Sequence, residues 1–277
     1  MKNQDVIVLG SGCSILDLSP PEIDYINNCE VIIAINKFMA FYQKSKILPT
    51  HVYFVDAYDK STVRFLQYIF DVCRNNKLEN LTFILNQKVM GFPLTGQRFC
   101  ASNLAFYIKN KYLGIEKSIH SRLFNGEKTN SNLFLVPPKC SFEFISHEHW
   151  LDGNQWSDTL KKPLFHYRGS LSTVLNYISI KYPNLPIKLL GVDFNSPGYF
   201  FQEELEKLNF SWQDWTTEIT KEKKTHFSAI SYKGTTIFDK FDFILAKLKE
   251  TGNELYSCNP QSLLVEKGFT KHKNVMT

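Results

Sequence analysis

The chain has 277 residues, of which 43% are apolar and 14% aromatic, and its formal net charge is +5. This composition is typical of a globular protein with a thick core, and it excludes a disordered chain. The longest apolar runs (VIVLG, VIIAI, LTFIL and IKLLGV) are far shorter than the about 20 residues that a membrane-spanning helix needs. The first residues lack the basic, apolar and small-residue succession of a secretion signal, so we expect a cytoplasmic protein.

Short apolar runs alternate along the chain with stretches of helical periodicity. We expect strands at Val6–Leu9, Val31–Ile35, His51–Val55, Leu81–Leu85, Leu133–Val136, Ile187–Val192 and Glu254–Ser257. We expect helices at Pro21–Asn27, Ser61–Arg74, Asn103–Lys111, Ser170–Lys181 and Ile237–Glu250. Apolar strands separated by helices are typical of strands that are buried on both faces. The predicted fold class is α/β, with a Rossmann-like, mostly parallel sheet flanked by helices.

Two stretches do not follow this alternation. Residues 121–132 (SRLFNGEKTNSN) are predicted to form an exposed loop. Residues 194–236 are rich in aromatic and basic side chains without strand periodicity, and we interpret them as an inserted lid. The lid follows a strand end, where open α/β sheets bind ligands. The predicted core is therefore residues 1–193 and 237–277. Within the lid, Trp212 and Trp215 either pack together or form a platform for a sugar.

The positive charge is concentrated late in the chain, in TKEKKTH (220–226) and EKGFTKHKNVMT (266–277). It forms either a solvated face or an attraction for an anionic partner, such as a nucleotide sugar or a membrane surface. Within the lid, Lys223 and Lys224 either serve solubility or meet an acidic acceptor. The sequence lacks the alternating basic and aromatic residues that bind single-stranded nucleic acid, so we expect no nucleic-acid partner.

Six cysteines stand at wide spacings without a CxxC motif, so we expect free thiols, several of them buried. His147 and His149, two positions apart, could chelate a metal from one strand. No third ligand accompanies them, and we expect no metal.

The first strand ends in a glycine turn, Gly10, Ser11 and Gly12. Glycines at such a turn let the backbone approach a ligand, and its N–H groups can bind a phosphate. The dinucleotide fingerprint needs a third glycine where this chain has Ile15, and an acidic residue where it has Asn36. The Asn36 amide both donates and accepts, and it does not repel phosphate. The turn therefore indicates a nucleotide other than NAD.

Three later positions extend this candidate site. Arg168, Ser170 and Ser172 open a predicted helix, so a guanidinium and two hydroxyls gather at its positive end. Asp193 ends the strand IKLLGVDF, either as a functional carboxylate or as a turn former. Arg168 faces an anionic ligand or bridges to Asp193. The stretch LYSCNPQSLL predicts a strand, an Asn-Pro turn and a serine-capped helix, either a nucleoside contact or a structural turn.

In this order, GSGCSI, INKF, RGSLS leading into LLGVDF, a lid with one histidine, and LYSCNPQSLL resemble the bacterial sialyltransferases of glycosyltransferase family 42. The resemblance covers nearly the whole chain and implies a GT-A-like variant of the fold. Enzymes of that family transfer sialic acid from CMP-sialic acid to a sugar, with inversion and without a metal. It therefore implies a CMP-sugar donor, no separate cofactor, and a glycan acceptor of lipooligosaccharide or capsule type.

The resemblance also implies residue roles. The turn Gly10, Ser11 and Gly12 would meet the CMP phosphate and ribose, and Asn36 would bind the nucleotide or phosphate. Asp56 stands where the family has an asparagine that touches the donor. The other implied binding positions are Ser170, Ser172, Pro260, Gln261 and Ser262, and Arg168 and Asp193 join them as candidates from the sequence pattern.

The chemistry of transfer assigns the remaining candidates. The leaving phosphate gains charge, which tyrosine hydroxyls can stabilise without a metal. Tyr199 is the first candidate for that role and Tyr232 the second. A histidine can take the proton of the attacking hydroxyl, and the resemblance assigns this role to His226.

Other readings stay open from the sequence. The donor could instead be CMP-Kdo or another CMP-activated nonulosonic acid. A dinucleotide-dependent oxidoreductase would explain the glycine turn, and a non-catalytic sugar-binding protein would keep the core without the histidine. The acceptor, a homo-oligomer and peripheral contact with the inner face of the cell membrane through the basic tail also stay open.

Overall fold

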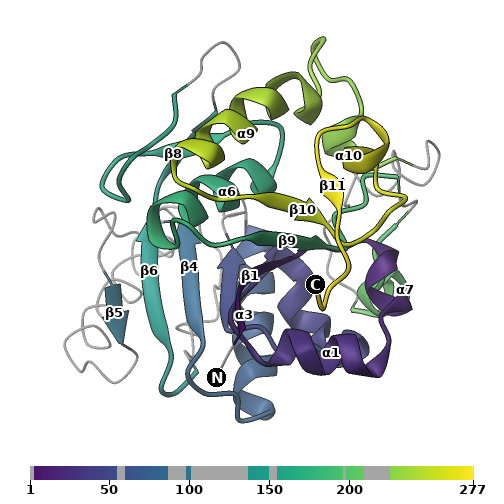
Figure 1. Cartoon of the computed structure of the whole chain (residues 1–277). Helices are drawn as coiled ribbons and strands as arrows, with labels where there is room; N and C mark the ends of the chain where they lie inside the picture. Colours follow the sequence, from purple (N-terminus) through teal and green to yellow (C-terminus); the bar gives the residue numbers. More distant parts are fainter. Residues whose placement is uncertain are drawn as a thin grey trace.

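The computed structural model describes residues 3–54, 60–86, 98–100, 137–149, 155–195, 198–208 and 225–277. Its described part contains a nine-stranded sheet with the strand order β11-β10-β9-β1-β2-β3-β4-β6-β5 (Figure 1). Neighbouring strands pair in parallel except for β5, which is antiparallel to β6. A separate parallel pair joins β7 and β8. The predicted α/β class with a mostly parallel sheet is confirmed.

The predicted strands within the described residues all overlap with observed strands. The strands are β1 (Asn3–Leu9), β2 (Cys29–Ile35), β3 (His51–Phe54), β4 (Thr82–Asn86), β5 (Arg98–Cys100), β6 (Ser141–Ile145), β7 (His147–His149), β8 (Leu164–His166), β9 (Ile187–Leu190), β10 (Leu255–Ser257) and β11 (Lys271–His272). The strand predicted at Leu133–Val136 lies outside the described residues. β5, β6, β7, β8 and β11 were not among the predicted strands. Four of them, β5, β7, β8 and β11, have at most three residues, which is too few to show a period.

The helices expected in the described residues are also present. The α-helices are α1 (Pro20–Asn27), α2 (Tyr42–Ser45), α3 (Lys60–Asn75), α6 (Ser170–Lys181), α7 (Gln202–Lys207), α9 (Phe241–Glu250) and α10 (Leu263–Glu266). The 3-10 helices are η1 (Cys13–Asp17), η2 (Asn36–Phe41), η3 (Phe227–Ala229) and η4 (Ile237–Lys240). The predicted helix Ile237–Glu250 is thus η4 followed by α9. The helix Asn103–Lys111 and the loop 121–132 lie outside the described residues.

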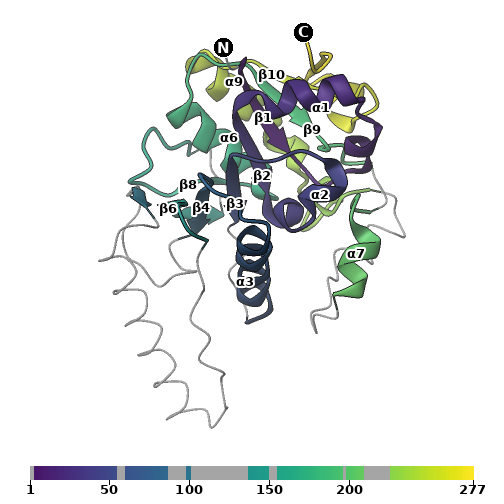
Figure 2. The same cartoon turned by 90° about the horizontal axis from the view of Figure 1, so that it is seen from below.

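Helices cover both faces of the sheet. Figures 1 and 2 show α1 and α3 on one face and α6 and α9 on the other. Along β1, Ile7 and Leu9 belong to the apolar cluster on the α1 face, and Val6 and Val8 to the cluster on the α6 face. All four are fully buried. Because successive strand residues point to opposite faces, an uninterrupted apolar run is what a sheet covered on both sides requires.

One charged side chain lies inside this core. Lys188 of β9 is fully buried, donates a hydrogen bond of 2.7 Å to the Val275 carbonyl, and pairs with Asp5 at 2.5 Å. The Tyr25 hydroxyl donates to the same carboxylate at 2.6 Å. These contacts compensate the buried charge and tie the end of the chain to β1, β9 and α1.

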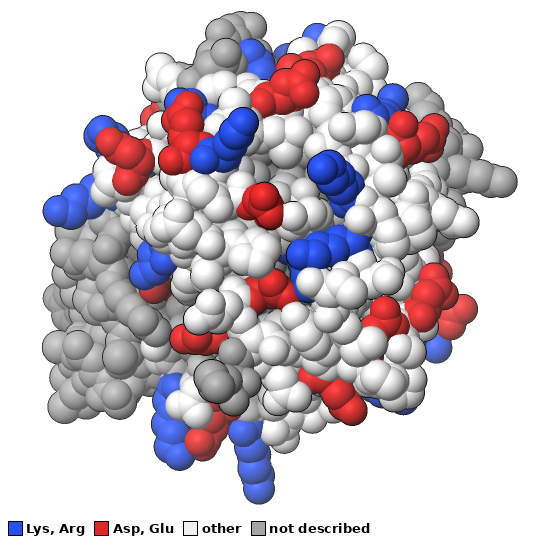
Figure 3. Space-filling model, in the orientation of Figure 1, with Lys and Arg blue, Asp and Glu red and all other residues white. Residues whose placement is uncertain are grey.

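The described thiols agree with the sequence analysis, which expected free and partly buried cysteines. In Figure 3, acidic and basic side chains are interspersed over the face shown. Cys29, Cys73 and Cys140 are buried free thiols, Cys258 is half-buried and Cys13 is exposed. Within the described ranges, no helix has the length and apolarity that crossing a membrane requires.

The strand order has a switch point beside β1. β2, β3 and β4 follow one another on one side of β1, and β9, β10 and β11 follow one another on the other side. In open α/β sheets, ligands bind outside the carboxyl ends of the strands at such a point. The glycine turn leaves β1 at this position.

Candidate functional site

Three strand ends meet at the carboxylate of Asp193, which is 4% exposed. Its Oδ1 accepts hydrogen bonds from the Ser14 hydroxyl at 2.6 Å and from the Asn259 side-chain amide at 2.9 Å. Its Oδ2 accepts from the Ser14 backbone N–H at 3.2 Å. Ser14 follows β1, Asp193 follows β9 and Asn259 follows β10. The stretches GSGCS, LLGVDF and SCNPQS are therefore joined at one buried group.

The glycines of the turn are required by the protein's own packing. The Gly10 N–H donates to the Leu190 carbonyl at 2.8 Å, and the Gly12 N–H donates to the Gly191 carbonyl at 2.7 Å. A Cβ atom on Gly10 would lie 2.3 Å from the Gly191 carbonyl oxygen, and one on Gly12 would lie 2.2 Å from Asp193 Oδ2. We expected free N–H groups that meet a phosphate, and for Gly10 and Gly12 that expectation was wrong. The two glycines instead let β1 and β9 close together.

The other residue of the turn, Ser11, is half-buried. Its carbonyl accepts a hydrogen bond of 3.0 Å from the Phe200 N–H. This contact brings the segment containing Tyr199 beside the end of β1.

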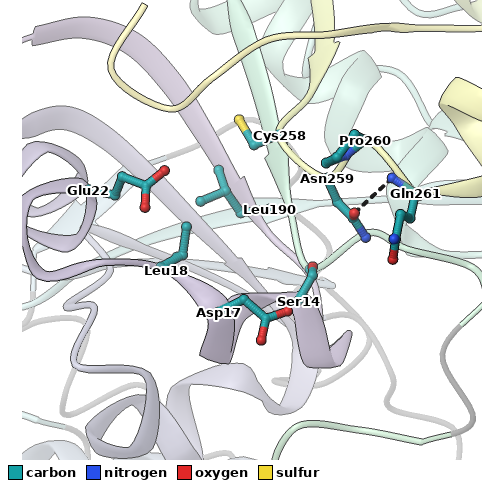
Figure 4. A pocket seen from close by; sticks show the side chains of 10 residues that line it. Ser14, Asp17, Leu18, Glu22, Leu190, Cys258, Asn259, Pro260 and Gln261 are labelled. Carbon is teal, nitrogen blue, oxygen red and sulfur yellow. Dashed lines mark hydrogen bonds between the residues drawn. The ribbon is translucent and has the colours of Figure 1, made fainter.

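A pocket of about 270 Å³ opens next to this junction (Figure 4). Its lining residues are Ser14, Asp17, Leu18, Glu22, Leu190, Gly191, Cys258, Asn259, Pro260 and Gln261. Pro260 and Gln261 thus lie where the sequence analysis predicts a binding surface. The volume suits part of a nucleotide sugar, since pockets for drug-sized ligands begin at about 300 Å³.

Ser262 is fully buried and does not line the pocket. Its hydroxyl contacts the Ser257 hydroxyl at 2.9 Å and accepts from the Val265 N–H at 3.4 Å, at the start of α10. Because no atom of Ser262 is exposed, it cannot make the expected contact with a ligand in this structure.

A second polar corner lies between β2 and α6. The Asn36 side-chain nitrogen donates to the Ser170 hydroxyl at 3.1 Å, and Asn36 itself has a left-handed backbone with φ of 51°. Its Oδ1 is buried and has no hydrogen-bond partner. An unsatisfied buried carbonyl costs about 1–3 kcal/mol, which a ligand with an N–H or O–H group would relieve. The positive end of α6 lies at the same corner.

The next two candidates have partners within the protein. Ser172 is fully buried, and its hydroxyl lies 2.9 Å from the Gly169 carbonyl and accepts from the Tyr167 N–H at 2.8 Å. It shapes the turn before α6 and has no exposed surface for a ligand. The Arg168 guanidinium donates to the backbone carbonyls of Phe227 and Ile230. A bridge from Arg168 to Asp193 is absent from the ion pairs of the described residues.

His226 lies beside the end of β9. Its N–H donates to the Phe194 carbonyl at 2.8 Å, and its ring meets the Phe194 ring at 5.7 Å. The ring Nδ1 accepts a hydrogen bond of 3.2 Å from the Ser228 N–H. A backbone N–H can only donate, so the neutral imidazole carries its proton on Nε2 in this arrangement. Through Nε2, the ring is then a donor.

The two tyrosine candidates lie at different places. The Tyr199 ring stacks on Phe201 at 5.2 Å and has the Lys37 ammonium 5.4 Å from its centre, next to the glycine turn. Tyr232 is 48% exposed and lies beside Arg168, 5.2 Å from the guanidinium carbon.

Five of the remaining candidates cannot be placed, and two lie in a short strand. Asp56, Trp212, Trp215, Lys223 and Lys224 are outside the described residues. His147 and His149 do form a strand, β7, and the described residues contain no group of three or more side chains that could hold a metal ion.

Two residues of the junction were missed by the sequence analysis. Ser14 stands in the quoted glycine turn and Asn259 in the quoted SCNPQS stretch, yet neither was singled out. A serine close to a glycine turn and an asparagine before a proline are typical turn formers, so their long-range partner had no local signal.

Fold and site together define an α/β protein with a polar site at the switch point of a parallel sheet. No family model matches the chain, and no curated protein sequence matches it. Among solved structures, a CMP complex of a variant of the sialyltransferase CstII is similar, with a TM-score of 0.42 and 15% identity over 100% of this chain and 88% of that chain. A CMP complex of a second CstII variant has a TM-score of 0.41 and 14% identity, over 99% of this chain and 88% of that chain. CstII from Campylobacter jejuni in complex with the substrate analogue CMP-3FNeuAc is similar with a TM-score of 0.42 and 15% identity. The match covers 98% of this chain and 87% of that chain.

Proposed function

We propose that the protein is a CMP-sugar-dependent glycosyltransferase that transfers sialic acid from CMP-sialic acid to a glycan. The observation that carries this proposal is the junction at Asp193. It joins, at the switch point of the sheet, three of the stretches whose order along the chain resembles family 42. A pocket lies against the same junction.

The pocket suits the nucleoside part of the donor. Leu18 and Leu190 supply apolar walls for a base, while the carboxylate of Asp17 can accept hydrogen bonds from ribose hydroxyls or an amino group. Asp17 and Glu22 would repel a phosphate. The phosphate therefore points away from them, toward Lys37, Tyr199 and the positive end of α6.

The sugar acid then lies over the corner of Asn36 and Ser170. Asn36 Oδ1, which is buried without a partner, would accept a hydrogen bond from a sugar hydroxyl or amide. The helix end would attract the carboxylate of the sugar. Asp56, which follows β3 in the chain and lies outside the described residues, is also proposed to contact the donor.

In the proposed reaction, the oxygen of an acceptor hydroxyl bonds to the anomeric carbon while the bond from that carbon to the phosphate oxygen breaks. CMP leaves with the bonding electrons, and the acceptor proton passes to His226. Attack opposite the leaving group inverts the configuration. The Tyr199 hydroxyl would donate to the departing phosphate and take the role that a metal has elsewhere. For His226 to accept through Nε2, its proton must sit on Nδ1, which requires the contact with the Ser228 N–H to open.

The acceptor is proposed to be a glycan of lipooligosaccharide or capsule type, in the cytoplasm or at the inner face of the membrane. CMP-Kdo and other CMP-activated nonulosonic acids are the nearest alternative donors, because they share the nucleotide and the acidic keto sugar.

A donor comparison tests the proposal. The protein is incubated with CMP-Neu5Ac or CMP-Kdo, each with a lactose-type or a lipopolysaccharide acceptor, and CMP release and product mass are measured. We expect CMP to raise the melting temperature, and CMP-Neu5Ac to give a sialylated product with or without EDTA. Turnover with CMP-Kdo and not with CMP-Neu5Ac would show that the donor is CMP-Kdo and not CMP-sialic acid. No CMP binding and no turnover with either donor would overturn the proposal, and a thermal shift with NAD instead would favour an oxidoreductase.

A further inference from the structure

We propose that Arg168 is a positioning residue that fastens residues 225–232, the histidine segment, to the start of α6. This role differs from the expected contact with an anionic ligand. It rests on the proposed function only where turnover is concerned, since the fastening itself can be measured without substrate.

The guanidinium of Arg168 is directed at the backbone of the histidine segment. Its Nη2 donates to the Ile230 carbonyl at 2.8 Å and to the Phe227 carbonyl at 3.3 Å. Its central carbon lies 5.0 Å from the ring centre of Phe227 and 5.2 Å from that of Tyr232. One side chain thus holds the segment through two carbonyls and two aromatic rings.

The backbone at Arg168 is shaped for this contact. Arg168 has a φ of 57° and Gly169 a φ of 151°, both in the region that L-residues rarely adopt. A Cβ atom on Gly169 would lie 2.6 Å from the Ser228 hydroxyl oxygen. A non-glycine residue in this conformation is strained and persists only where its surroundings hold it. Here the next residue, Ser170, opens α6 and accepts the hydrogen bond from Asn36.

The charge of Arg168 is itself in an unfavourable environment. Burial lowers the pKa of its guanidinium from the usual value, and its Nε is buried without a hydrogen-bond partner. In the described residues, no carboxylate forms an ion pair with it. Carbonyls and ring faces compensate such a charge only partly. An arginine at this position therefore contributes more to the placement of the segment than to stability.

The fastened turn is the one that orients His226. Within it, the Ala229 N–H donates to the His226 carbonyl at 2.9 Å, the Ile230 N–H to the Phe227 carbonyl at 3.1 Å, and the Ser228 N–H to His226 Nδ1 at 3.2 Å. Loss of Arg168 releases the two carbonyls at the far side of this turn. The imidazole then loses its fixed position beside the end of β9, which lowers turnover, whereas the pocket keeps its lining, which does not include Arg168.

Hydrogen exchange of the ligand-free protein tests the fastening. In Arg168→Ala, we expect the amides of Ser228, Ala229 and Ile230 to exchange about tenfold faster, with β1 and β9 unchanged. Arg168→Lys keeps the charge without the fork and should show an intermediate effect. Added guanidinium should restore protection to Arg168→Ala. The matched control is Arg74→Ala, which removes an exposed arginine paired only with Asp71 among the described ion pairs.

Two further measurements separate positioning from ligand binding. In Arg168→Ala, the ¹⁵N chemical shifts of the His226 ring should move toward a mixture of tautomers, and kcat should fall about 10- to 100-fold while KM for the donor and CMP affinity stay unchanged. Guanidinium should restore kcat as well. Unchanged exchange in Arg168→Ala, or a loss of CMP affinity in parallel with kcat, would overturn the proposal. A wild-type protein without CMP binding or turnover would end the proposed function alone, because the exchange data would still decide the role of Arg168.

Discussion

The hydroxyl of Ser14 donates a hydrogen bond of 2.6 Å to Asp193, a residue 179 positions further along the chain. This contact ties η1, which follows β1, to the end of β9. Asn259 adds the end of β10 to the same carboxylate. Asp193 therefore joins segments that follow three strands, next to the pocket that Ser14 and Asn259 line, through one buried group.

Replacing Asp193 by asparagine should destabilise the protein. All three groups that bond to this carboxylate are donors, so an amide nitrogen would face an N–H or O–H group and leave a buried donor unsatisfied. We expect a loss of about 2–3 kcal/mol in the free energy of unfolding, measured by urea denaturation. Asp158→Asn is the control, because this side chain is 80% exposed and its substitution should change the stability very little. Equal effects of the two variants would refute the central role of Asp193.

Gly12→Ala should force β1 and β9 apart. The new methyl group would lie 2.2 Å from Asp193 Oδ2, closer than real Cβ contacts. We expect a loss of about 1–3 kcal/mol in stability and weaker CMP binding, measured by thermal unfolding and calorimetry. Gly198→Ala serves as the control for stability, since its nearest neighbour would be 3.8 Å away in the Gln202 side chain. A wild-type melting temperature in Gly12→Ala would show that the junction is not closely packed.

Stability should fall at alkaline pH because of buried thiols. Burial raises the pKa of Cys73 and of Cys258 from 9.0 to about 12, and the pKa of Cys29 and of Cys140 from 9.0 to about 11. Between pH 9 and these raised values, the unfolded chain loses thiol protons that the folded chain keeps. The unfolded state then binds fewer protons, so the free energy of unfolding decreases by about 1.4 kcal/mol per pH unit for each thiol.

Urea denaturation between pH 8 and pH 11 measures that slope. Cys73→Ala should remove the share of one thiol from the slope, whatever it does to stability at neutral pH. A slope that does not respond to Cys73→Ala would contradict the assignment.

His226→Ala should reduce transfer by at least about 100-fold and leave CMP affinity nearly unchanged. A base acts on the acceptor proton and not on the nucleotide, and His226 is not part of the pocket lining. Donor turnover and CMP calorimetry on the same preparation measure the two effects. Full activity of the variant would remove His226 from the proposed mechanism, and loss of CMP binding would reassign it to the donor site.

The amino-acid sequence alone determined the fold class and the strand ends at which the candidate site is built. The apolar runs of β1, β2 and β9 are continuous because these strands are buried on both faces, and that pattern is local. The strand ends at Gly10, Asn36 and Asp193 could be found for the same reason. By contrast, β8 and β11 have three and two residues, too few to show a period.

What the polar residues contact was decided only by the tertiary structure. Ser14 bonds to Asp193, Asn36 meets Ser170, and Arg168 turns to the carbonyls of the histidine segment, across separations of 59 to 179 positions. Such contacts depend on which strands become neighbours and in which register, and β1 lies between β2 and the distant β9. Local periodicity describes burial along one strand, whereas a hydrogen bond between strand ends exists only after the whole sheet has been assembled.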